Sequence, residues 1–499
     1  MVHDGGPVGL DGVEVEFDDE RVVSDAGVAL AATLAGRLGI EALVGRLVGL
    51  RPDRPGAVNA GRKVMTLIYA MALGADCIDD CDVLRSGRTR RLLGGWVATP
   101  STLGTFLRAF TFGHVRQLDR VLGECLTRAW KAGAGPGDGR LTVDVDSFVG
   151  EVHGYAKQGA AFGYTRKRGY HPIVASRAET GEVLHLRLRK GSANTQRGIL
   201  RFCDELIARV SRAGASGAKL FRADSGFWNT RVFERLERAG WQFSIGVRMI
   251  KSVRDVVDQI DESAWRAIDD YPDTGEAQIA EATLGGRRLI VRRVRILGDQ
   301  AELFPDWRHF PFATNRTENI ATVEAAHRQH AVVELVIRDL KDQALRHFPS
   351  GQFNANAAWT VIAGLAHNLL RWTALIGLPD RVIRAARTLR RRLLALPGPL
   401  TTHAGCTSPP AGPGKTTSSK RSPVFERSPP PDRAAPRYRP ADPRATRRRS
   451  PLPRQQTKQA SNPDPETRPR HAGQRQHRPP LRPARTLTLP AQDRCATVT

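Results

Sequence analysis

The chain has 499 residues and carries 76 Lys and Arg against 51 Asp and Glu, a formal net charge of +25. Such an excess favours a polyanion such as nucleic acid over a membrane or an acidic protein as the partner, although a basic surface can also serve solubility alone. The acidic N-terminal segment lacks the apolar core of a signal peptide, and no run of about 18 uncharged apolar residues occurs, so we expect no membrane partner and a cytoplasmic location.

Residues 1–135 are expected to form a mostly helical region. Apolar residues recur at intervals of three and four over much of residues 24–131, which is the spacing of amphipathic helices. One of these helices should begin after Thr99, a favourable N-cap that is followed by proline. On this helix Thr105 and Arg108 face outward, where they could contact bases in a DNA major groove. An ordinary amphipathic helix is the alternative.

Residues 136–380 mix strands and helices, which predicts an α/β fold. Alternating apolar residues and turn signals predict the strands, and apolar spacing of three and four predicts the helices. Strands are expected near 141–148, 171–177, 183–189, 218–223 and 242–247, and again within 276–314. Helices are expected near 194–213, 228–239, 321–346 and 355–376.

Two carboxylates share one face of the strand LTVDVDS (141–147). Side chains alternate along a strand, so Asp144 and Asp146 point the same way, roughly 7 Å apart. Asp224 stands where another strand, KLFRA, gives way to a Ser-Gly turn, and ligands gather at strand ends in mostly parallel sheets. Because carboxylates are costly to bury without partners, we expect this face to hold a cation. For Asp224 alone, a role as turn residue or helix cap is the alternative.

A third acid lies on the predicted helix HRQHAVVELVIRDLK (327–341). At about 100° per residue, five of its polar side chains fall within one arc of roughly 80°; they are His327, His330, Glu334, Arg338 and Lys341. Apolar residues fill much of the remaining circumference, which predicts a buried helix whose polar stripe faces a site. The alternative is a solvated face on which Glu334 pairs with Arg338 and Lys341.

Three carboxylates from two strands and one helix are what two divalent cations need for phosphoryl transfer. Two metal ions about 4 Å apart can activate the attacking oxygen and stabilise the leaving one. Mg²⁺ is the expected ion because it binds a few carboxylates and keeps other positions for water and phosphate oxygens; Mn²⁺ is the expected substitute. The predicted ligands are Asp146, Asp224 and Glu334, with Asp144 as a further candidate.

Three blocks occur in order along the chain: LTVDVDSFVGEVHGYAKQGAAFGYTRKRGYHP, FRADSGFW and HRQHAVVELVIRDLKDQALRHFPSGQFNANAAW. They resemble the DDE transposases of bacterial insertion sequences, specifically DDE domain group 1, and the resemblance covers roughly residues 10–395. It implies an RNase H-like catalytic core in which Asp146, Asp224 and Glu334 are the catalytic acids. A β-rich insertion at about 250–318 would precede the last of these acids.

The resemblance also implies an activity. The protein would bind the terminal inverted repeats of an insertion sequence, cleave DNA strands with the help of metal ions and transfer the cut ends to target DNA, at the bacterial nucleoid. Two ends must be held together, so we expect a homodimer. The rival interpretations are an RNase H-like nuclease without strand transfer and a non-catalytic DNA-binding protein derived from such an element. The complete acid triad weighs against the second rival.

The surroundings of the third acid depart from the relatives at two positions. Related transposases often show Tyr, two residues, Arg, three residues, Glu, six residues and Lys. Here His327 and His330 replace the Tyr and the Arg, whereas the spacing of Lys341 is kept, so a phosphate-contacting role is carried over to Lys341. Arg328 and Arg338 are further basic candidates beside the acid.

A basic loop, GYTRKRG (163–169), lies between two predicted strands. Its side chains could grip DNA phosphates, contacts that position a protein on DNA without reading the base sequence. The candidate residues in this loop are Arg166, Lys167 and Arg168.

The end of the chain differs in kind from the rest. Residues 381–397 read as a basic helix, and residues 398–499 are rich in Pro, Arg and Ser. Such a composition cannot bury enough apolar surface to offset chain entropy, which predicts a disordered basic tail. A frameshift just after Pro397 would explain the abrupt change. The alternative is a genuine basic arm that adds salt-sensitive affinity for DNA.

Overall fold

The structure is a computed structural model, and it describes residues 22–163, 165–269, 271, 276–295, 307–378 and 384–399. These residues all belong to one unit, residues 1–407. The Pro/Arg-rich tail lies outside the described residues except for Gly398 and Pro399, so its predicted disorder and the predicted frameshift stay predictions.

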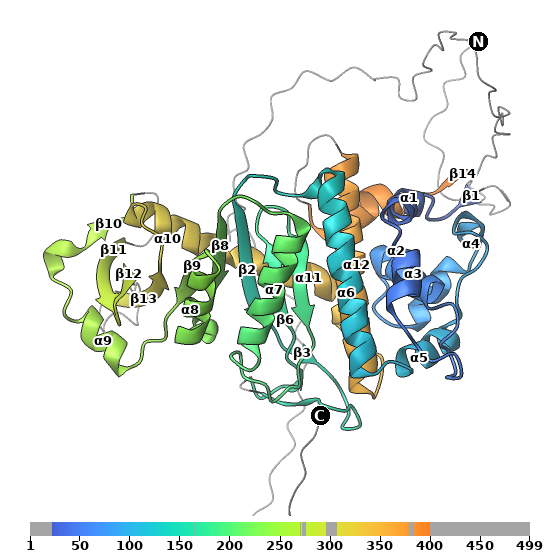
Figure 1. Cartoon of the computed structure of the whole chain (residues 1–499), viewed down its shortest axis with the longest axis horizontal. Coiled ribbons are helices and arrows are strands. Elements are labelled where there is room, and N and C mark those ends of the chain that lie inside the picture. Colours follow the sequence, from blue (N-terminus) through green and yellow to red (C-terminus); the bar gives the residue numbers. More distant parts are fainter. Residues whose placement is uncertain are drawn as a thin grey trace, which may run out of the picture. The chain divides into compact units, whose positions relative to one another are not determined.

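Five consecutive strands at one end of a nine-stranded sheet have the order β7-β6-β2-β8-β9 (Figure 1). β2, β8 and β9 run parallel, whereas β6 runs antiparallel to both β2 and β7. This order, with the antiparallel strand beside the first, is the RNase H-like arrangement, and it confirms the predicted α/β core. The strands are β2 (Leu141–Ser147), β6 (Ile173–Arg177), β7 (Val183–Arg187), β8 (Lys219–Ala223) and β9 (Gln242–Gly246).

Helices cover the central strands on both faces. α7 (Ile199–Ala213) leads from β7 to β8, and α8 (Thr230–Arg238) leads from β8 to β9; the two helices pack against each other. α11 (Val332–Leu340) packs on β2 and β6, and Figure 1 shows α7 in front of the sheet and α11 behind it. The first five residues of β2 are therefore buried whichever way they point.

The predicted β-rich insertion extends the same sheet. β11 (Ala277–Leu284) and β12 (Arg287–Arg295) form a hairpin whose turn residues, Gly285 and Gly286, have positive φ angles of 55° and 76°, as a two-residue turn between right-twisted strands requires. β13 (Trp307–Thr314) then pairs antiparallel with both β12 and β9, so backbone hydrogen bonds join the insertion to the core. The insertion also contains α9 (Lys251–Val257) and β10 (Arg266–Ala267).

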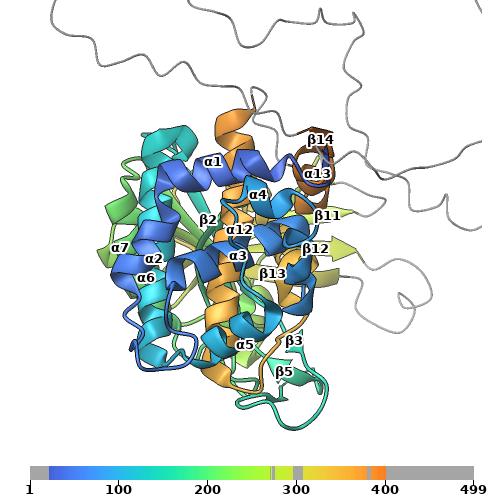
Figure 2. The same ribbon diagram turned by 90° about the vertical axis from the view of Figure 1, so that its right-hand side faces the viewer.

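The N-terminal helices share their core with a helix from the other end of the fold. They are α1 (Val28–Leu38), α2 (Ile40–Leu47), α3 (Ala60–Leu73), α4 (Thr89–Leu92), α5 (Pro100–Arg108) and α6 (Phe112–Ala129). α12 (Phe353–Gly377) is buried from Ala355 to Ala374 and packs against α1, α3, α5 and α6 (Figures 1 and 2). The described part of the N-terminal region is thus helical, as predicted, and α12 completes its core.

Helix α5 has the predicted start and the predicted orientation. Thr99 caps the helix through its hydroxyl, which accepts a hydrogen bond from the N–H of Thr102 (3.4 Å), and Pro100 is the first helical residue. Leu103 is buried, whereas Arg108 is exposed. Capping and apolar spacing are local properties of the chain, and here they were enough to place the helix.

A small sheet follows β2 that the sequence pattern does not predict. β3 (Gly150–Glu151), β4 (Ala161–Phe162) and β5 (Arg168–Tyr170) pair in the order β3-β5-β4. Strands of two or three residues are too short to show a clear alternation of side chains. The backbones approach closely, because a Cβ atom on Gly169 would lie 2.3 Å from the carbonyl oxygen of Gly150.

The helix predicted at 321–346 is interrupted. α10 (Ile320–Arg328) and α11 are separated by a 3-10 turn at Gln329–Ala331. Such a turn winds more tightly than an α-helix, so the side chains before and after it change their relative direction. The prediction that the apolar residues of α11 are buried is wrong for Leu335, whose side chain is 47% exposed.

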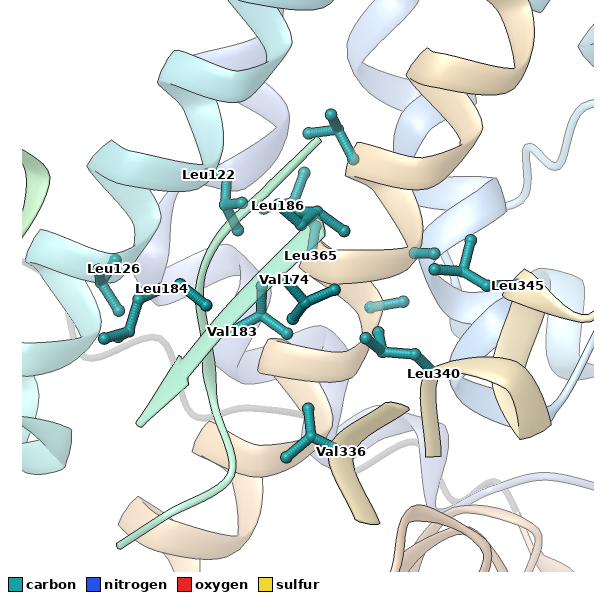
Figure 3. Close-up of a cluster of buried hydrophobic side chains, with 14 of the residues drawn as sticks. Leu122, Leu126, Val174, Val183, Leu184, Leu186, Val336, Leu340, Leu345 and Leu365 are labelled. Carbon is teal, nitrogen blue, oxygen red and sulfur yellow. The ribbon is translucent and has the colours of Figure 1, made fainter. Parts of the chain in front are cut away.

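The buried side of α11 helps to close the main core. Val336 and Leu340 lie in one cluster with Val174 of β6, Leu186 of β7 and Leu365 of α12 (Figure 3). Residues that are far apart in the sequence thus pack against one another. This packing fixes α11, and the acid that it carries, against the sheet.

The two ends of the described chain meet. β1 (Val22–Val23) pairs antiparallel with β14 (Gly398–Pro399). The predicted basic helix at 381–397 contains α13 (Ala386–Leu389) and a π-helical turn at Arg390–Leu394. Within the described part of the chain, no single helix combines the length and the apolarity of a membrane span; α1 and α2 meet that criterion only jointly, across a 49° bend.

A buried ion-pair network ties α6, β7 and α7 together. Arg209 Nη2 lies 2.8 Å from Asp119 Oδ1, and the ring of His185 lies between Asp119 (3.4 Å) and Glu205 (3.0 Å). Ligand atoms of Asp119, His185 and Glu205 lie within 4.8 Å of one another, as those of a metal site could. Arg116 contacts both acids as well. Cationic side chains therefore already compensate Asp119 and Glu205, and we interpret the group as a structural network rather than a metal site.

We expect Asp119→Asn to lower the free energy of unfolding by about 3 kcal/mol, because Arg209 would stay buried without its counter-charge. Burial alone would raise the pKa of Asp119, but the positive charges of Arg209 and His185 hold this pKa well below its usual range. The matched control is Asp204→Asn, since Asp204 pairs with Arg235 while 53% exposed, and it should change stability by less than about 1 kcal/mol. Chemical denaturation of both variants checks this; equal losses would contradict it.

Candidate active site

The ends of two neighbouring parallel strands bring the first two predicted acids together. Val145 of β2 pairs with Ala223 of β8. The next residues along the two strands, Asp146 and Asp224, therefore lie side by side at the same edge of the sheet. This edge is where ligands gather in sheets of mostly parallel strands.

Each of these two acids holds one hydrogen bond from a nearby backbone N–H. Asp146 Oδ1 accepts from Ser147 (2.6 Å), and Asp224 Oδ1 accepts from Gly226 (3.0 Å). Asp224 thereby caps the short 3-10 turn Ser225–Phe227. The cap role considered for Asp224 is thus real, and it occupies one of the two carboxylate oxygens.

Glu334 joins the group from the first turn of α11, where it is exposed and lines the same cavity as Asp224. The pKa of Asp146 is raised to about 6, first by burial and then by the negative charges of Asp224 and Glu334. Burial also raises the pKa of Asp224. The three predicted catalytic acids are therefore close enough to repel one another.

A cavity of 820 Å³ lies beside the acids. Asp224, His330 and Glu334 line it from the core, and Arg248 and Phe310 line it from β9 and the insertion. Arg248 is exposed, and its positive charge acts to lower the pKa of Asp224. The sequence pattern does not single out Arg248, because its place beside Asp224 depends on the pairing of β8 with β9.

Asp144, the further metal candidate, is already paired. It is fully buried and accepts two hydrogen bonds from Arg222, its register partner on β8, with Nε at 2.6 Å and Nη2 at 2.8 Å. Arg222 also donates to the carbonyls of Ala326 and Gln329 (3.4 Å for the latter). Asp144 thus shares a strand face with Asp146, as predicted, but Arg222 compensates its charge.

The two histidines before Glu334 point to different places. His327 Nδ1 lies 2.8 Å from the hydroxyl of Ser244, and its ring stacks on Phe312 with 4.1 Å between the ring centres. Burial lowers the pKa of His327 to about 3. His330, beyond the start of the 3-10 turn, places Nδ1 3.1 Å from Asp144 Oδ1. Only His330 is therefore held at the strand that carries the first acid.

The basic residues predicted near the third acid differ in their surroundings. Arg338 is exposed on α11. Lys341 is half-buried with its Nζ 5.0 Å from the ring centre of Phe148, and burial lowers its pKa. Arg328 pairs with Glu324 at 3.3 Å. Arg328 is thus compensated within the protein, whereas Arg338 is open to a polyanion.

The basic loop lies between β4 and β5 of the small sheet. Arg166 is exposed and has a left-handed backbone conformation with φ of 57°. Lys167 is exposed and its Nζ lies 2.5 Å from Glu151. Arg168 donates to the carbonyl of Tyr155 (2.8 Å), so it holds the loop together. Arg166 and Lys167 are the members of the loop that present charge to solvent.

The predicted DNA contacts on α5 lie on its outer face. Arg108 is exposed, and its Nη2 lies 3.2 Å from the hydroxyl of Thr105. Thr105 in turn donates its hydroxyl to the carbonyl of Ser101 (3.0 Å). These two side chains therefore form one polar patch on the surface of α5.

A histidine that the sequence pattern does not single out lies behind Asp146. His171 donates from Nδ1 to the carbonyl of Ala193 (2.6 Å), which leaves Nε2 to accept from the hydroxyl of Ser147 (3.0 Å). Ser147 directly follows Asp146 and donates its N–H to it. His171 thus supports the backbone at the first acid. In the sequence, only its position directly before Pro172 could have drawn attention to it.

The donor set suits divalent cations. Burial and the negative charges of Asp224 and Glu334 raise the pKa of Asp146, and a divalent cation between the acids would offset those charges. Carboxylate oxygens are also the hard ligands that Mg²⁺ and Mn²⁺ prefer. The residues that would hold the ions are Asp146, Asp224 and Glu334.

Comparison with known proteins gives a family and a structural neighbour. The family model "Transposase DDE domain group 1" matches residues 6–406. A search of curated proteins finds no match. Among solved structures, the chain is similar to the cryo-EM structure of a piggyBac transposase synaptic complex with hairpin DNA, with 11% sequence identity, a TM-score of 0.42 and coverage of 75% of this chain and 80% of that chain.

We expect the metal-free protein to lose stability as the pH rises from about 4 to about 6. Asp146 has a folded-state pKa of about 6 against an ordinary value of 3.8, so in this range the folded state holds a proton that the unfolded state has released. Asp146→Asn should match wild type near pH 4 and exceed its free energy of unfolding by about 3 kcal/mol at pH 8.

Denaturation with a chelator present, at a series of pH values, measures this difference. The control is Asp138→Asn, which alters an exposed turn before β2 and should follow wild type at every pH. If the free energy of unfolding varied with pH in the same way in wild type and Asp146→Asn, ionisation of Asp146 would not be what destabilises the folded state.

Proposed function

The chain belongs to the transposase DDE domain group 1 family, and on this basis we propose that it moves an insertion sequence within bacterial DNA. It binds the terminal inverted repeats, hydrolyses a phosphodiester bond with an activated water and joins the freed 3′-OH to target DNA. The observation that supports this most is the convergence of Asp146, Asp224 and Glu334 at one edge of the RNase H-like sheet, where burial and the charges of the other two acids raise the pKa of Asp146.

In this proposal Asp146, Asp224 and Glu334 hold two Mg²⁺ ions, which Mn²⁺ can replace. When bound, the ions supply Lewis acidity at the attacking and leaving oxygens. The side chains of the protein keep the three acids in position, because Arg222 joins β2 to the segment before α11. Asp144 is left out of the ligand set, since Arg222 compensates its charge.

Three basic side chains are assigned to the phosphates next to the reacting bond. Arg248 lies at the end of β9 beside Asp224, and Arg338 lies one helical turn after Glu334; both are exposed. Lys341 follows on the same helix and is partly covered. Positive charge near the acids would bind the DNA backbone that carries the reacting phosphate.

The outer face of α5, with Thr105 and Arg108, is assigned to reading the end sequence. Arg166 and Lys167 on the small sheet are assigned to phosphates, because they present charge to solvent next to the segment that follows Asp146. The formal net charge of +25 suits binding to double-stranded DNA, which is a polyanion. A homodimer would hold both ends of the element in one complex.

Two rival functions share parts of this geometry. An RNase H-like nuclease would use the same acids without strand transfer, and a non-catalytic derivative would bind DNA only. A supercoiled plasmid that carries two element ends, incubated with the protein and Mg²⁺, separates the three. Joined products support the transposase, nicking alone supports the nuclease, and binding alone supports the derivative.

Asp146→Asn, Asp224→Asn and Glu334→Gln should each reduce cleavage on the order of 10³-fold or more, because each removes a ligand of the ions that activate the reaction. Binding to end DNA should stay largely intact, since phosphate contacts dominate affinity. The plasmid assay and a binding assay measure the two effects. The control Glu234→Gln alters an exposed acid on α8 and should cleave normally; normal cleavage by a variant of the triad would remove that residue from the site.

Arg108→Ala should weaken the preference for end DNA over random duplex by about 1–3 kcal/mol, because a base contact carries sequence information. Lys167→Ala should weaken both complexes alike and reduce the salt slope by about 1. Binding is measured at several salt concentrations with the full chain, because α12 completes the core of the N-terminal helices. An unchanged preference in Arg108→Ala would place specificity in the small sheet or the insertion.

A further inference from the structure

The hydrogen bond between Asp144 and His330 fixes the proton on the imidazole. Asp144 is fully buried and accepts two hydrogen bonds from Arg222, so it is an ionised acceptor. His330 Nδ1 lies 3.1 Å from the same carboxylate. A carboxylate of this kind can only accept, so Nδ1 carries a hydrogen atom and donates it. The other ring nitrogen, Nε2, is then free of this bond and lies on the far side of the ring.

His330 shares a cavity with two of the three acids. It lines the same cavity as Asp224 and Glu334. The bond from its Nδ1 to Asp144 holds the ring beside β2, two residues before Asp146 along that strand. His330 lies in the 3-10 turn that directly precedes α11, and Glu334 stands in the first turn of α11. An imidazole ring therefore lies at the cavity that Asp224 and Glu334 also line.

We propose that Nε2 of His330 is a further ligand of one of the metal ions held by Asp146, Asp224 and Glu334. Metal-binding histidines almost always donate their other ring N–H to a carboxylate or carbonyl, which orients the ring and raises its basicity. Asp144 is that carboxylate here, and Arg222 holds it in place. The inference rests on the metal site of the proposed function and adds a nitrogen donor to it.

The neighbouring histidines are less suited to this role. His327 bonds Ser244 through Nδ1, and its ring stacks on Phe312. His171 has both ring nitrogens engaged, one with Ala193 and one with Ser147. His330, by contrast, is bonded to a carboxylate through Nδ1, and it lines the cavity.

A nitrogen ligand changes which ions the site prefers. Oxygen-only sites suit Mg²⁺, whereas imidazole is a better ligand for transition metals. A site that includes His330 should therefore bind Mn²⁺ more tightly than Mg²⁺. Removal of the imidazole should weaken Mn²⁺ binding by about tenfold or more and leave Mg²⁺ binding less affected.

The experiment uses Mn²⁺ bound to the full chain without DNA and requires no catalysis. Pulsed electron paramagnetic resonance detects the ¹⁴N coupling of an imidazole bound directly to Mn²⁺, and ¹⁵N-histidine labelling identifies its source. We expect this coupling in wild type and its loss in His330→Asn. Asparagine can place an amide N–H near the position of Nδ1, so it keeps the bond to Asp144 and lacks only the nitrogen donor. Circular dichroism checks that the variant is folded.

His309→Asn is the matched control, because His309 lines the same cavity from β13. This variant should keep the coupling and the Mn²⁺ affinity. Bound Mn²⁺ without ¹⁴N coupling in wild type, or coupling that persists in His330→Asn, would overturn the ligand role of His330 and leave the proposed function standing. A chain that binds no Mn²⁺ would overturn both. A chain that shows the coupling but does not join DNA would keep the ligand and reject strand transfer.

Discussion

The buried pair between Asp144 and Arg222 is the contact on which the geometry of the site depends. It crosses from β2 to β8, the two strands whose ends carry Asp146 and Asp224, and it is almost inaccessible to solvent. Arg222 also donates to the carbonyls of Ala326 and Gln329, just before α11. One guanidinium therefore sets the position of the strand ends relative to the helix with the third acid. Removal of either partner would leave a buried charge unpaired at this junction, which is costly.

Partly buried carboxyl groups have pKa values shifted in opposite directions in two parts of this fold. In the network of α6, β7 and α7, the partners of Glu205 lower its pKa to about 2 against the effect of burial. At the edge of the sheet, burial and repulsion raise the pKa of Asp146 to about 6. Burial is common to both places, so the difference lies in the counter-charges. Acids that the fold leaves without full compensation are those that can bind a cation, and a strongly perturbed pKa in a cleft is a sign of function.

The sequence was sufficient where local patterns decide the structure. Alternation placed β2 and the four other central strands, and the capping signal at Thr99 placed α5, because both depend on near neighbours in the chain. The ion pair of Asp144 was not predictable in this way, since the register of β2 against β8 determines that Arg222 lies beside it. The 3-10 turn between α10 and α11, which contains His330, was not predicted for the same reason. It coincides with a tertiary contact, the hydrogen bonds that Arg222 donates to the carbonyls of Ala326 and Gln329.

The continuity of the main sheet makes the insertion part of the site. β13 pairs directly with β9, the strand that ends just before Arg248, so the far wall of the cavity and the acid edge belong to one hydrogen-bonded structure. The insertion is also closely packed near this wall: Arg293 lies 4.1 Å and 4.4 Å from the ring centres of Trp265 and Trp307, and Trp307 lines the cavity. Such packing gives both attraction between cation and ring and close contact. The far wall and the acid edge are thus two sides of one cavity, and the pairing of β13 with β9 sets the distance between them.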